Sequence, residues 1–251
     1  MKLGKHAARH DPRTLKLLRY VRAQLPPPKP AVNWSKRVSR WGVMKNNTLG
    51  DCTCAAAGHL IRLWTASTKT VRDEDIIEAY RALSGYQPGK PATDRGAVEL
   101  DVLKYWRKTG IGGHRILAFV AVEPGEIDQI KTSIELFGGC YIGLELPLSA
   151  QKQRVWSVPP SGAKGKAKPG SWGGHAVPVV AYDARGLTVV TWGATKRMTW
   201  DFWRAYCDEA YALLSTYWID AHCGVNPEGF ALDQLKADLA AVTDAREDQA
   251  A

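Results

Sequence analysis

Apolar residues in the first half of the chain recur at helical spacing. After Cys52 the apolar positions Leu60, Leu63 and Trp64 share one stripe, and the small residues next to the cysteine permit close packing. Similar periodicity, with glycines after the last turns, marks three more segments. The pattern predicts helices over about 52–68, 73–84, 97–108 and 125–137, preceded by a short basic helix over 12–24 that ends at a proline-rich stretch.

The pattern changes after residue 138. Short β-branched or aromatic runs are bounded there by Gly, Pro and Asp, which is typical of strands. They predict strands over 140–146, 175–182, 187–192 and about 210–218, with a hairpin turn at 183–186. A surface loop is expected over 157–170, a short helix over 200–206 and a terminal amphipathic helix over 229–242. Helices first and antiparallel strands second predict an α+β fold.

Charge is distributed unevenly along the 251 residues. The net charge is +9, but residues 1–40 alone hold eleven Lys and Arg against one Asp, so the remainder sums to −1. A basic arm of this kind binds a polyanion, packs on the acidic C-terminal tail or is solvated. No aromatic residue interleaves its charges before Tyr20, which disfavours nucleic-acid binding.

Nothing in the hydropathy pattern indicates a membrane or an export signal. No apolar run approaches the roughly 18 residues of a membrane span, and no apolar stretch follows the basic N-terminus. The expected location is therefore a reducing cytoplasm. The odd number of cysteines, five, at irregular spacing fits free thiols, and no CxxC pair suggests zinc. We expect no metal and no cofactor.

The segment Asn46–Cys52 combines features of a reactive thiol. A cysteine at a helix N-terminus lies where backbone N–H groups and the helix dipole favour the thiolate. Gly50 lets a substrate backbone approach, and the Asn46 amide can donate to an oxyanion. Asp51 can cap the helix, but its charge would raise the pKa of the thiol. A buried structural cysteine is the alternative reading.

His175 is the second candidate. The phrase Ser171–His175 opens a predicted strand after the flexible loop 157–170, which places the imidazole at a sheet edge. A single histidine is usually structural, but one that accompanies a helix-terminal cysteine is a candidate base. Three other cysteines, at 54, 140 and 207, are expected in strand or helix cores, and His59 is expected to pack.

These two motifs resemble those of the papain-like cysteine peptidases. That family has an amide residue six positions before the nucleophile and then Gly-x-Cys opening a central helix, which here are Asn46, Gly50 and Cys52. Its histidine opens a strand in a phrase like GGHAVxVVGY, and here 173–182 reads GGHAVPVVAY. The wording of NNTLGDCT, GGHAV and TWGA is closest to phage- and prophage-encoded members, which implies a bacterial host cytoplasm or a virion as the location.

The resemblance implies a helical lobe, whose central helix starts at Cys52, packed against an antiparallel β lobe. It implies a domain over 33–222, mainly helical over about 33–137 and mainly antiparallel β over about 138–222. Residues 1–32 would be a basic arm and connector, and 223–251 a C-terminal helix and acidic tail.

The implied activity is that of a cysteine-type peptidase or related amide hydrolase acting on peptide or protein. Cys52 would be the nucleophile, His175 the base and acid, and Asn46 the oxyanion donor. The family's third member is an Asn or Asp, but here Thr191 stands sixteen residues after His175, with Asp183 as a remote alternative. The cleft would be lined by a further set of residues, namely Gly50, Asp51, Gly174 and Trp192, with the Trp192 ring shielding His175 from water.

Two departures from the family keep other functions open. Thr191 stabilises an imidazolium less than an amide or carboxylate would, and Asp51 opposes thiolate formation. A catalytically silent papain-like protein that binds a partner or belongs to a virion is therefore the alternative function. Nucleic-acid binding through the basic arm is a third hypothesis.

Overall fold

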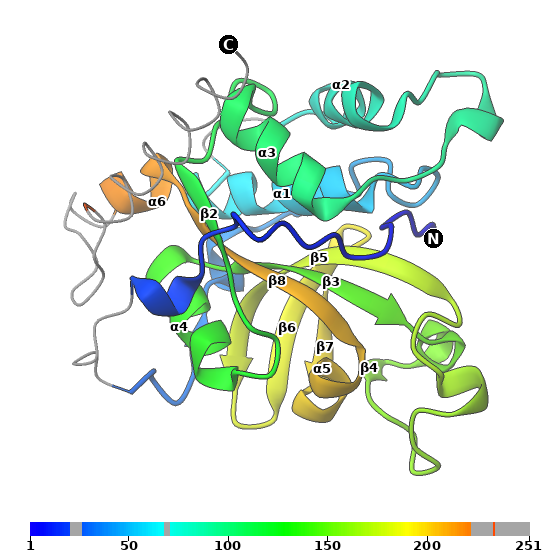
Figure 1. Ribbon diagram of the computed structural model, residues 1–251, viewed down its shortest axis with the longest axis vertical. Coiled ribbons are helices and arrows are strands. Elements are labelled where there is room, and N and C mark those ends of the chain that lie inside the picture. The colour runs from blue at the N-terminus through cyan, green and yellow to red at the C-terminus, as the bar shows by residue number, and fades with distance from the viewer. Residues whose placement is uncertain (21–26, 68–70, 222–232, 234–251) are drawn as a thin grey trace.

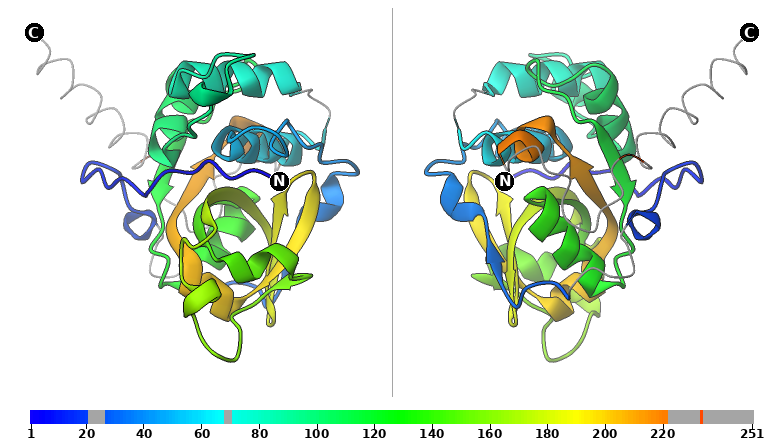
Figure 2. Two further views of the ribbon diagram at one scale, coloured as in Figure 1. Left: turned by 90° about the vertical axis from the view of Figure 1, so that its right-hand side faces the viewer. Right: turned by 90° about the vertical axis from the view of Figure 1, so that its left-hand side faces the viewer.

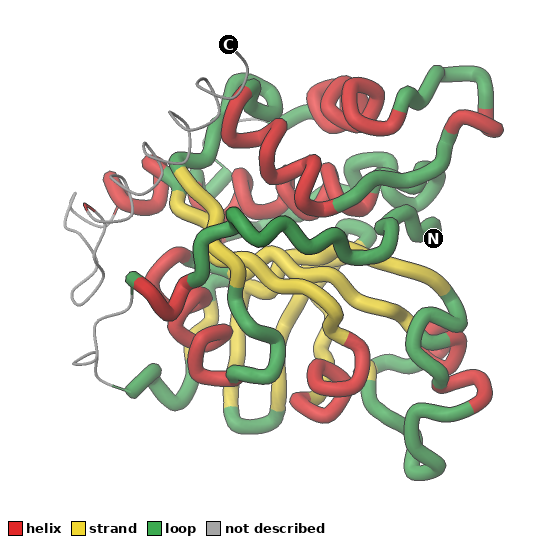
Figure 3. Tube along the Cα trace, viewed as in Figure 1, coloured by secondary structure: helices red, strands yellow, loops and turns green. Residues whose placement is uncertain are grey.

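The structure is a computed structural model, and it describes residues 1–20, 27–67, 71–221 and 233. Helices α1 (Cys52–Trp64), α2 (Asp73–Ser84) and α3 (Glu99–Lys108) gather on one side of a sheet, as Figures 1 and 3 show. Helices α4 (Ile127–Phe137) and α5 (Trp200–Tyr206) contribute to the core on the opposite face. The short helix α6 (Thr216–Ala221) follows the last strand.

The sheet has eight strands in the order β2-β8-β3-β5-β6-β7-β4, with β1 paired to β5. Their bounds are β1 Val32–Asn33, β2 Ala118–Ala121, β3 Cys140–Leu146, β4 Val155–Trp156, β5 Gly173–Asp183, β6 Gly186–Thr191, β7 Ala194–Thr199 and β8 Cys207–Leu214. The pairings are antiparallel except for β4 with β7. The long strand β5 joins β3 to β6 and therefore lies in the middle of the sheet.

Both faces of the central strands are buried, and alternate residues enter different clusters. In β3, Tyr141 packs with the helical layer, whereas Ile142 packs with α4 and α5. In β5, Ala176 and Val177 divide in the same way. This is the two-residue alternation of a strand, and burial on both sides explains why these strands read as nearly continuous apolar runs.

Helix α1 is the centre of the helical layer. All of its residues except Arg62 are buried, which is the pattern of a helix enclosed on every side. Its small residues permit this packing: a Cβ added at Gly58 would lie 2.6 Å from the Sδ atom of Met44. The helix packs directly on β5, and this contact fixes the position of Cys52 relative to His175.

Several predicted boundaries were wrong. The described part of 12–24 holds only a 3₁₀ turn over Leu17–Arg19, because a buried Leu17 is not enough to order a longer helix on the surface. The last strand is Cys207–Leu214 rather than 210–218, since α6 begins at Thr216. Cys207 consequently opens a strand and is half-buried instead of lying in a helix core. The helix predicted over 229–242 lies outside the described residues.

Candidate active site

Cys52 is the first residue of α1, as the sequence predicts, and its side chain meets β5. The backbone N–H of Ala176 donates to the Cys52 sulfur at 3.5 Å. Ala176 directly follows His175, so the residue next to the candidate base contacts the thiol across the boundary between the helical layer and the sheet. Both side chains are about 1% exposed.

His175 is held by two side chains from the end of β6. Its Nε2 atom lies 2.7 Å from the Thr191 hydroxyl oxygen, and its ring stacks on Trp192 with centroids 4.6 Å apart at 15°. Its Nδ1 atom is buried and has no hydrogen-bond partner among the described residues. The imidazole is thus fixed through one nitrogen and one face, while the other nitrogen remains unpaired.

A tight hairpin turn places Trp192. Strands β6 and β7 are joined by Trp192 and Gly193, which have φ values of 47° and 82°. Positive φ at both central residues is the pattern of a type I′ turn, and the right-handed twist of the hairpin favours it. Tryptophan rarely adopts this backbone conformation, so contacts of the ring with His175, Trp156 and Trp172 must hold it there.

The loop before Cys52 forms a network of buried polar groups. The Asn46 amide nitrogen donates to the Leu49 carbonyl at 3.3 Å and to the Asp51 carboxyl at 3.2 Å. Asp51 is at the N-cap position of α1, but its side chain makes no capping hydrogen bond. Burial raises the pKa of Asp51 to about 8, so at neutral pH this group is mostly protonated and puts little negative charge beside the thiol.

Asp94 supports this loop from the helical side, and no sequence motif indicated it. Its carboxylate accepts hydrogen bonds from the Gly50 backbone N–H at 3.0 Å and from the Tyr80 hydroxyl at 2.5 Å, and it pairs with Lys2. The Tyr80 hydroxyl in turn accepts from the Gly96 backbone N–H at 2.8 Å. Asp94 therefore ties the glycine before the nucleophile to the loop that follows α2.

The first six residues of the chain, here called the cover segment, run between the two lobes directly over the thiol. Figures 1 and 2 show this segment between α1 and α3 on one side and the sheet on the other. On the helical side, Ala97 donates its N–H to the Gly4 carbonyl at 2.8 Å and accepts from the His6 N–H at 3.0 Å. On the sheet side, the Lys5 N–H donates to the Gly174 carbonyl at 3.1 Å.

Glycines allow the backbone of the cover segment to come this close. A Cβ added at Gly4 would lie 1.8 Å from the Gly50 carbonyl oxygen. One at Gly96 would lie 2.0 Å from the Gly4 carbonyl oxygen, and one at Gly174 would lie 2.2 Å from that of Lys5. Gly50 and Gly174 are both expected to line a substrate cleft. In this structure they contact the backbone of the cover segment instead.

Burial under the cover segment sets the ionisation of the pair. It raises the pKa of the Cys52 thiol to about 12, although the N–H groups of Ala176 and Gly4 partly oppose this effect. Burial also lowers the pKa of His175 to about 3. In the covered form the site therefore holds a neutral thiol and a neutral imidazole, since neither charged form is solvated.

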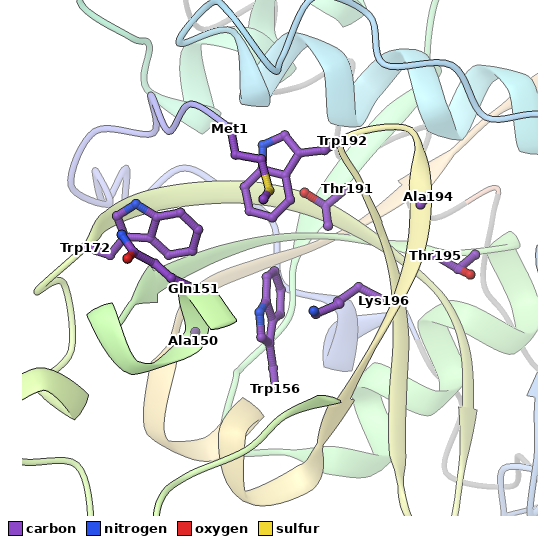
Figure 4. Close-up of a pocket in the computed structure, with 10 residues that line it drawn as sticks. All are labelled: Met1, Ala150, Gln151, Trp156, Trp172, Thr191, Trp192, Ala194, Thr195 and Lys196. Carbon is purple, nitrogen blue, oxygen red and sulfur yellow. The ribbon is translucent and has the colours of Figure 1, made fainter. Parts of the chain in front are cut away.

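A hollow lies beside Thr191 and Trp192, the two residues that contact His175. The hollow has a volume of about 240 Å³. Figure 4 shows the rings of Trp156, Trp172 and Trp192 around it, and the exposed Met1 side chain also lines it. Thr191 also lines this cavity, and Lys196 borders it. The aromatic walls suit an apolar or planar group beside the His175 and Trp192 stack.

The structure brings most of the predicted site residues together and separates one. Asp183, the alternative partner for His175, lies eight residues further along β5, or about 26 Å in an extended strand, and bonds Arg197 instead. His59 packs, with its Nε2 atom 3.0 Å from the Gly42 carbonyl. Lys5, Glu99, Asp208 and Glu209, also near the thiol, were not predicted. The one signal was an acidic pair opening the apolar run CDEAYALL.

Comparisons with known proteins address the fold. No protein-family model and no curated protein matches the sequence. Among solved structures, xylellain, a cysteine protease from Xylella fastidiosa, aligns with a TM-score of 0.63 and 16% identity over 85% of this chain and 96% of its own. A Carica candamarcensis cysteine protease aligns with a TM-score of 0.52 and 13% identity over 74% and 99%. Procathepsin L 3 of Tenebrio molitor aligns with a TM-score of 0.57 and 12% identity over 82% of this chain and 75% of its own.

The chain therefore has the papain-like α+β fold, in which a helical lobe with its central helix starting at Cys52 packs against a β lobe. No helix within the described residues is both long and apolar enough to cross a bilayer. In the same part of the chain, no group of three or more His, Cys, Asp or Glu side chains is arranged to hold a metal ion.

Proposed function

We propose that this chain is a papain-like cysteine peptidase or related amide hydrolase that its own cover segment keeps closed. One observation carries the proposal. His175 bonds Thr191 through Nε2 and leaves Nδ1 buried and unpaired, while the next backbone N–H contacts the sulfur of Cys52. A nucleophile beside a base that a third group orients is the arrangement that covalent catalysis requires.

The reaction is acyl transfer through a thioester. His175 Nδ1 takes the thiol proton, and the Cys52 sulfur attacks the substrate carbonyl carbon. The carbon–nitrogen bond then breaks, and the imidazolium returns its proton to the leaving amine. A water molecule gives a proton to His175 and attacks the thioester, which releases the acid and restores the thiol. Thr191 accepts the Nε2–H bond throughout and so keeps Nδ1 available for the proton.

The oxyanion donors are the Cys52 backbone N–H and the Asn46 amide. In the covered form both N–H groups of Asn46 are engaged, one with Leu49 and one with Asp51. The hydrogen bond to the Leu49 carbonyl, at 3.3 Å, is the longer of the two. We expect Asn46 to give it up and donate to the oxyanion when substrate binds.

Activation consists of removing the cover segment from the cleft. Water then reaches both groups, the desolvation that separates the two pKa values is relieved, and the thiolate–imidazolium pair becomes accessible. The helix N-terminus favours the thiolate in that state.

The test uses a variant that cannot keep the segment in place. Gly4→Ala puts a methyl group 1.8 Å from the Gly50 carbonyl oxygen, whereas in the control Gly125→Ala the added Cβ meets no atom within 4 Å. The Carica protease structure contains the inhibitor E-64. We expect E-64 to label Cys52 at least tenfold faster in Gly4→Ala than in the control, by peptide mass spectrometry. Peptide hydrolysis should also appear in Gly4→Ala and vanish when Cys52→Ala is added.

A catalytically silent binding protein is the second candidate, because Thr191 replaces the amide or carboxylate that orients the imidazole in the family. Its expected result is clear: Gly4→Ala exposes Cys52 to iodoacetamide, but no peptide or isopeptide bond is hydrolysed. The phage or prophage attribution, with a bacterial cytoplasm or a virion as the location, rests on sequence motifs alone and stays a prediction.

The proposal does not include a nucleic-acid partner. Much of the basic arm is engaged with acids of the same chain: Lys2 with Asp94, Lys5 with Asp208, and Arg9 with Asp101. Charge that is already paired releases few counterions from a phosphate backbone. The N-terminal excess of positive charge is better explained by packing against acidic groups near the cleft.

A further inference from the structure

The side chain of Lys5 is buried in an acidic pocket beside the thiol. Its ammonium nitrogen lies 2.6 Å from an Asp208 oxygen and 3.0 Å from a Glu209 oxygen, and the side chain is 1% exposed. Lysine is rarely buried to this extent unless it is paired. Two carboxylates at contact distance make this the most specific contact of the cover segment.

A β-bulge creates the pocket. Consecutive residues of a regular strand point to opposite faces, so Asp208 and Glu209 should diverge. The pairing of β8 with β3 shifts register here: Gly143 pairs with Glu209, but the next residue, Leu144, pairs with Cys207. The extra residue, Asp208, re-aims the chain and lets both carboxylates reach one ammonium group.

Gly143 is the floor of the pocket. A Cβ at this position would lie 2.1 Å from the Lys5 Cε atom and 2.7 Å from an Asp208 oxygen. Only glycine leaves room here for a long aliphatic side chain to lie against the sheet. Tyr211 completes the frame, because its hydroxyl donates to Glu209 at 2.9 Å and fixes that carboxylate.

Glu99 adds a third carboxyl behind the other two. It is the first residue of α3 and fully buried, and neither oxygen has a hydrogen-bond partner among the described residues. Burial and the nearby Glu209 raise the pKa of Glu99. For Lys5, burial alone would lower the pKa, but the surrounding acids Glu99, Glu209 and Asp208 outweigh it and raise the pKa.

We propose that this pocket, formed by Glu99, Asp208 and Glu209, selects a lysine or arginine side chain of the substrate, and that Lys5 occupies it as a built-in competitor. The proposal rests on the proposed hydrolase function and adds a substrate class to it. An apolar side chain in the same place would leave buried carboxylates without a partner, which is strongly unfavourable.

The position of the selected residue follows from the cover segment. The Gly4 backbone lies at the thiol, since its N–H is among the groups that stabilise the Cys52 sulfur. Lys5 is the next residue, so the basic side chain of a substrate falls within one or two residues of the bond that is cleaved. A cavity of about 390 Å³, lined in part by residues 8–12, also borders Asp208 and Glu209.

Binding tests the pocket without requiring catalysis. The protein is the full chain carrying Cys52→Ala and Lys5→Glu, in which repulsion from the acids expels the cover segment. The probes are a fluorescent peptide of residues 2–9 and the same peptide with norleucine in place of Lys5. We expect the lysine peptide to bind at least tenfold more tightly by fluorescence anisotropy. Adding Glu209→Gln should shrink this ratio, and adding Asp201→Asn, on the exposed face of α5, should not.

Equal binding of the two peptides overturns the proposal. The proposal also fails if neither peptide binds because the segment carrying Lys5→Glu stays in the cleft. That case is recognised by alkylation of Cys52 that is as slow in Lys5→Glu alone as in the unsubstituted chain. The pocket would then accept an acidic side chain where the proposal requires a basic one.

Turnover separates this inference from the proposed function. In the full chain with Lys5→Glu, we expect peptides carrying Lys or Arg within two residues of the cleaved bond to be hydrolysed at least tenfold faster than norleucine peptides. Hydrolysis without that preference overturns the basic specificity and leaves the hydrolase intact. Selective binding with no hydrolysis of any peptide supports the pocket and refutes the hydrolase.

Discussion

The hydroxyl oxygen of Thr191 lies 2.7 Å from Nε2 of His175, inside a site from which water is excluded. A neutral hydroxyl here can accept the ring N–H but adds no negative charge to stabilise an imidazolium. The orientation of the ring is therefore secured by hydrogen bonding and by the stack on Trp192, rather than by a charge pair.

Thr191→Val should disable this orientation, because valine keeps the shape but leaves a buried ring nitrogen unpaired. We expect the free energy of unfolding to fall by about 1–3 kcal/mol and kcat/KM in the Gly4→Ala background to fall at least tenfold. Thr191→Ser retains the hydroxyl and should stay within threefold of the parent. Equal activity of the Val and Ser variants would show that the hydroxyl does not orient the base.

Acid should open the cleft. His175 has a pKa of about 3 when covered, because of burial and the nearby His59, against about 6.5 when solvated. The uncovered form thus binds more protons as the pH falls below about 6.5, and the covered form loses about 2 kcal/mol relative to it by pH 5.

The measurement is hydrogen exchange of the amides of residues 2–6 between pH 7 and 5, corrected for intrinsic rates. Protection should fall at least tenfold, while amides in the middle of β5 should change little. Unchanged protection of these amides from exchange would mean that the position of the cover segment does not depend on the protonation of His175.

Trp192→Asn should uncover one face of His175. Asparagine tolerates the left-handed backbone of the type I′ turn, so the turn survives while the stacked ring is lost. Water then reaches the imidazole, and its pKa should rise from about 3 by one unit or more. An NMR titration of the ring protons checks this shift, and a pKa that stays near 3 would show that other groups keep His175 dry.

Asp94→Ala should loosen the loop that carries the nucleophile. It leaves the Gly50 N–H and the Tyr80 hydroxyl without their acceptor, which costs about 2–4 kcal/mol and lowers Tm by several degrees. Tyr80→Phe removes the hydroxyl that donates to Asp94 and accepts from the Gly96 N–H, but it leaves Asp94 bonded to Gly50 and paired with Lys2, so it should cost only about 1–2 kcal/mol. Thermal unfolding measured on both variants tests the ranking, and the reverse order would contradict it.

Local patterns accounted for much of the fold. Helix α2 occupies 73–84, as its periodicity and the closing Gly85 predict, and Cys140–Leu146 has the predicted strand bounds. Strand β7 was missed because ATKRMT is mostly polar and only Met198 is fully buried, so the sequence lacks an apolar face there. Its place depends on pairing with β6, which no local pattern reveals.

The candidate site also contains residues that local sequence motifs indicate and residues that they do not. Cys52 and His175 could be found because each sits in a short motif whose local geometry, a helix start and a strand start, has chemical meaning. Asp94, Glu99 and the pair at 208–209 act through contacts that the chain makes only when folded. Lys5 reaches Asp208 across 203 positions, and neither residue has a neighbour that indicates the other.

The same distance along the chain has a consequence for biosynthesis. The cover segment leaves the ribosome before its partners at 97, 174 and 208, the last of which lies at the start of β8. The nascent chain therefore carries Lys5 without its Asp208 anchor until about 200 further residues have been translated. Closing the cleft is among the last steps of folding, and a chain truncated before Asp208 would lack the anchor that keeps it shut.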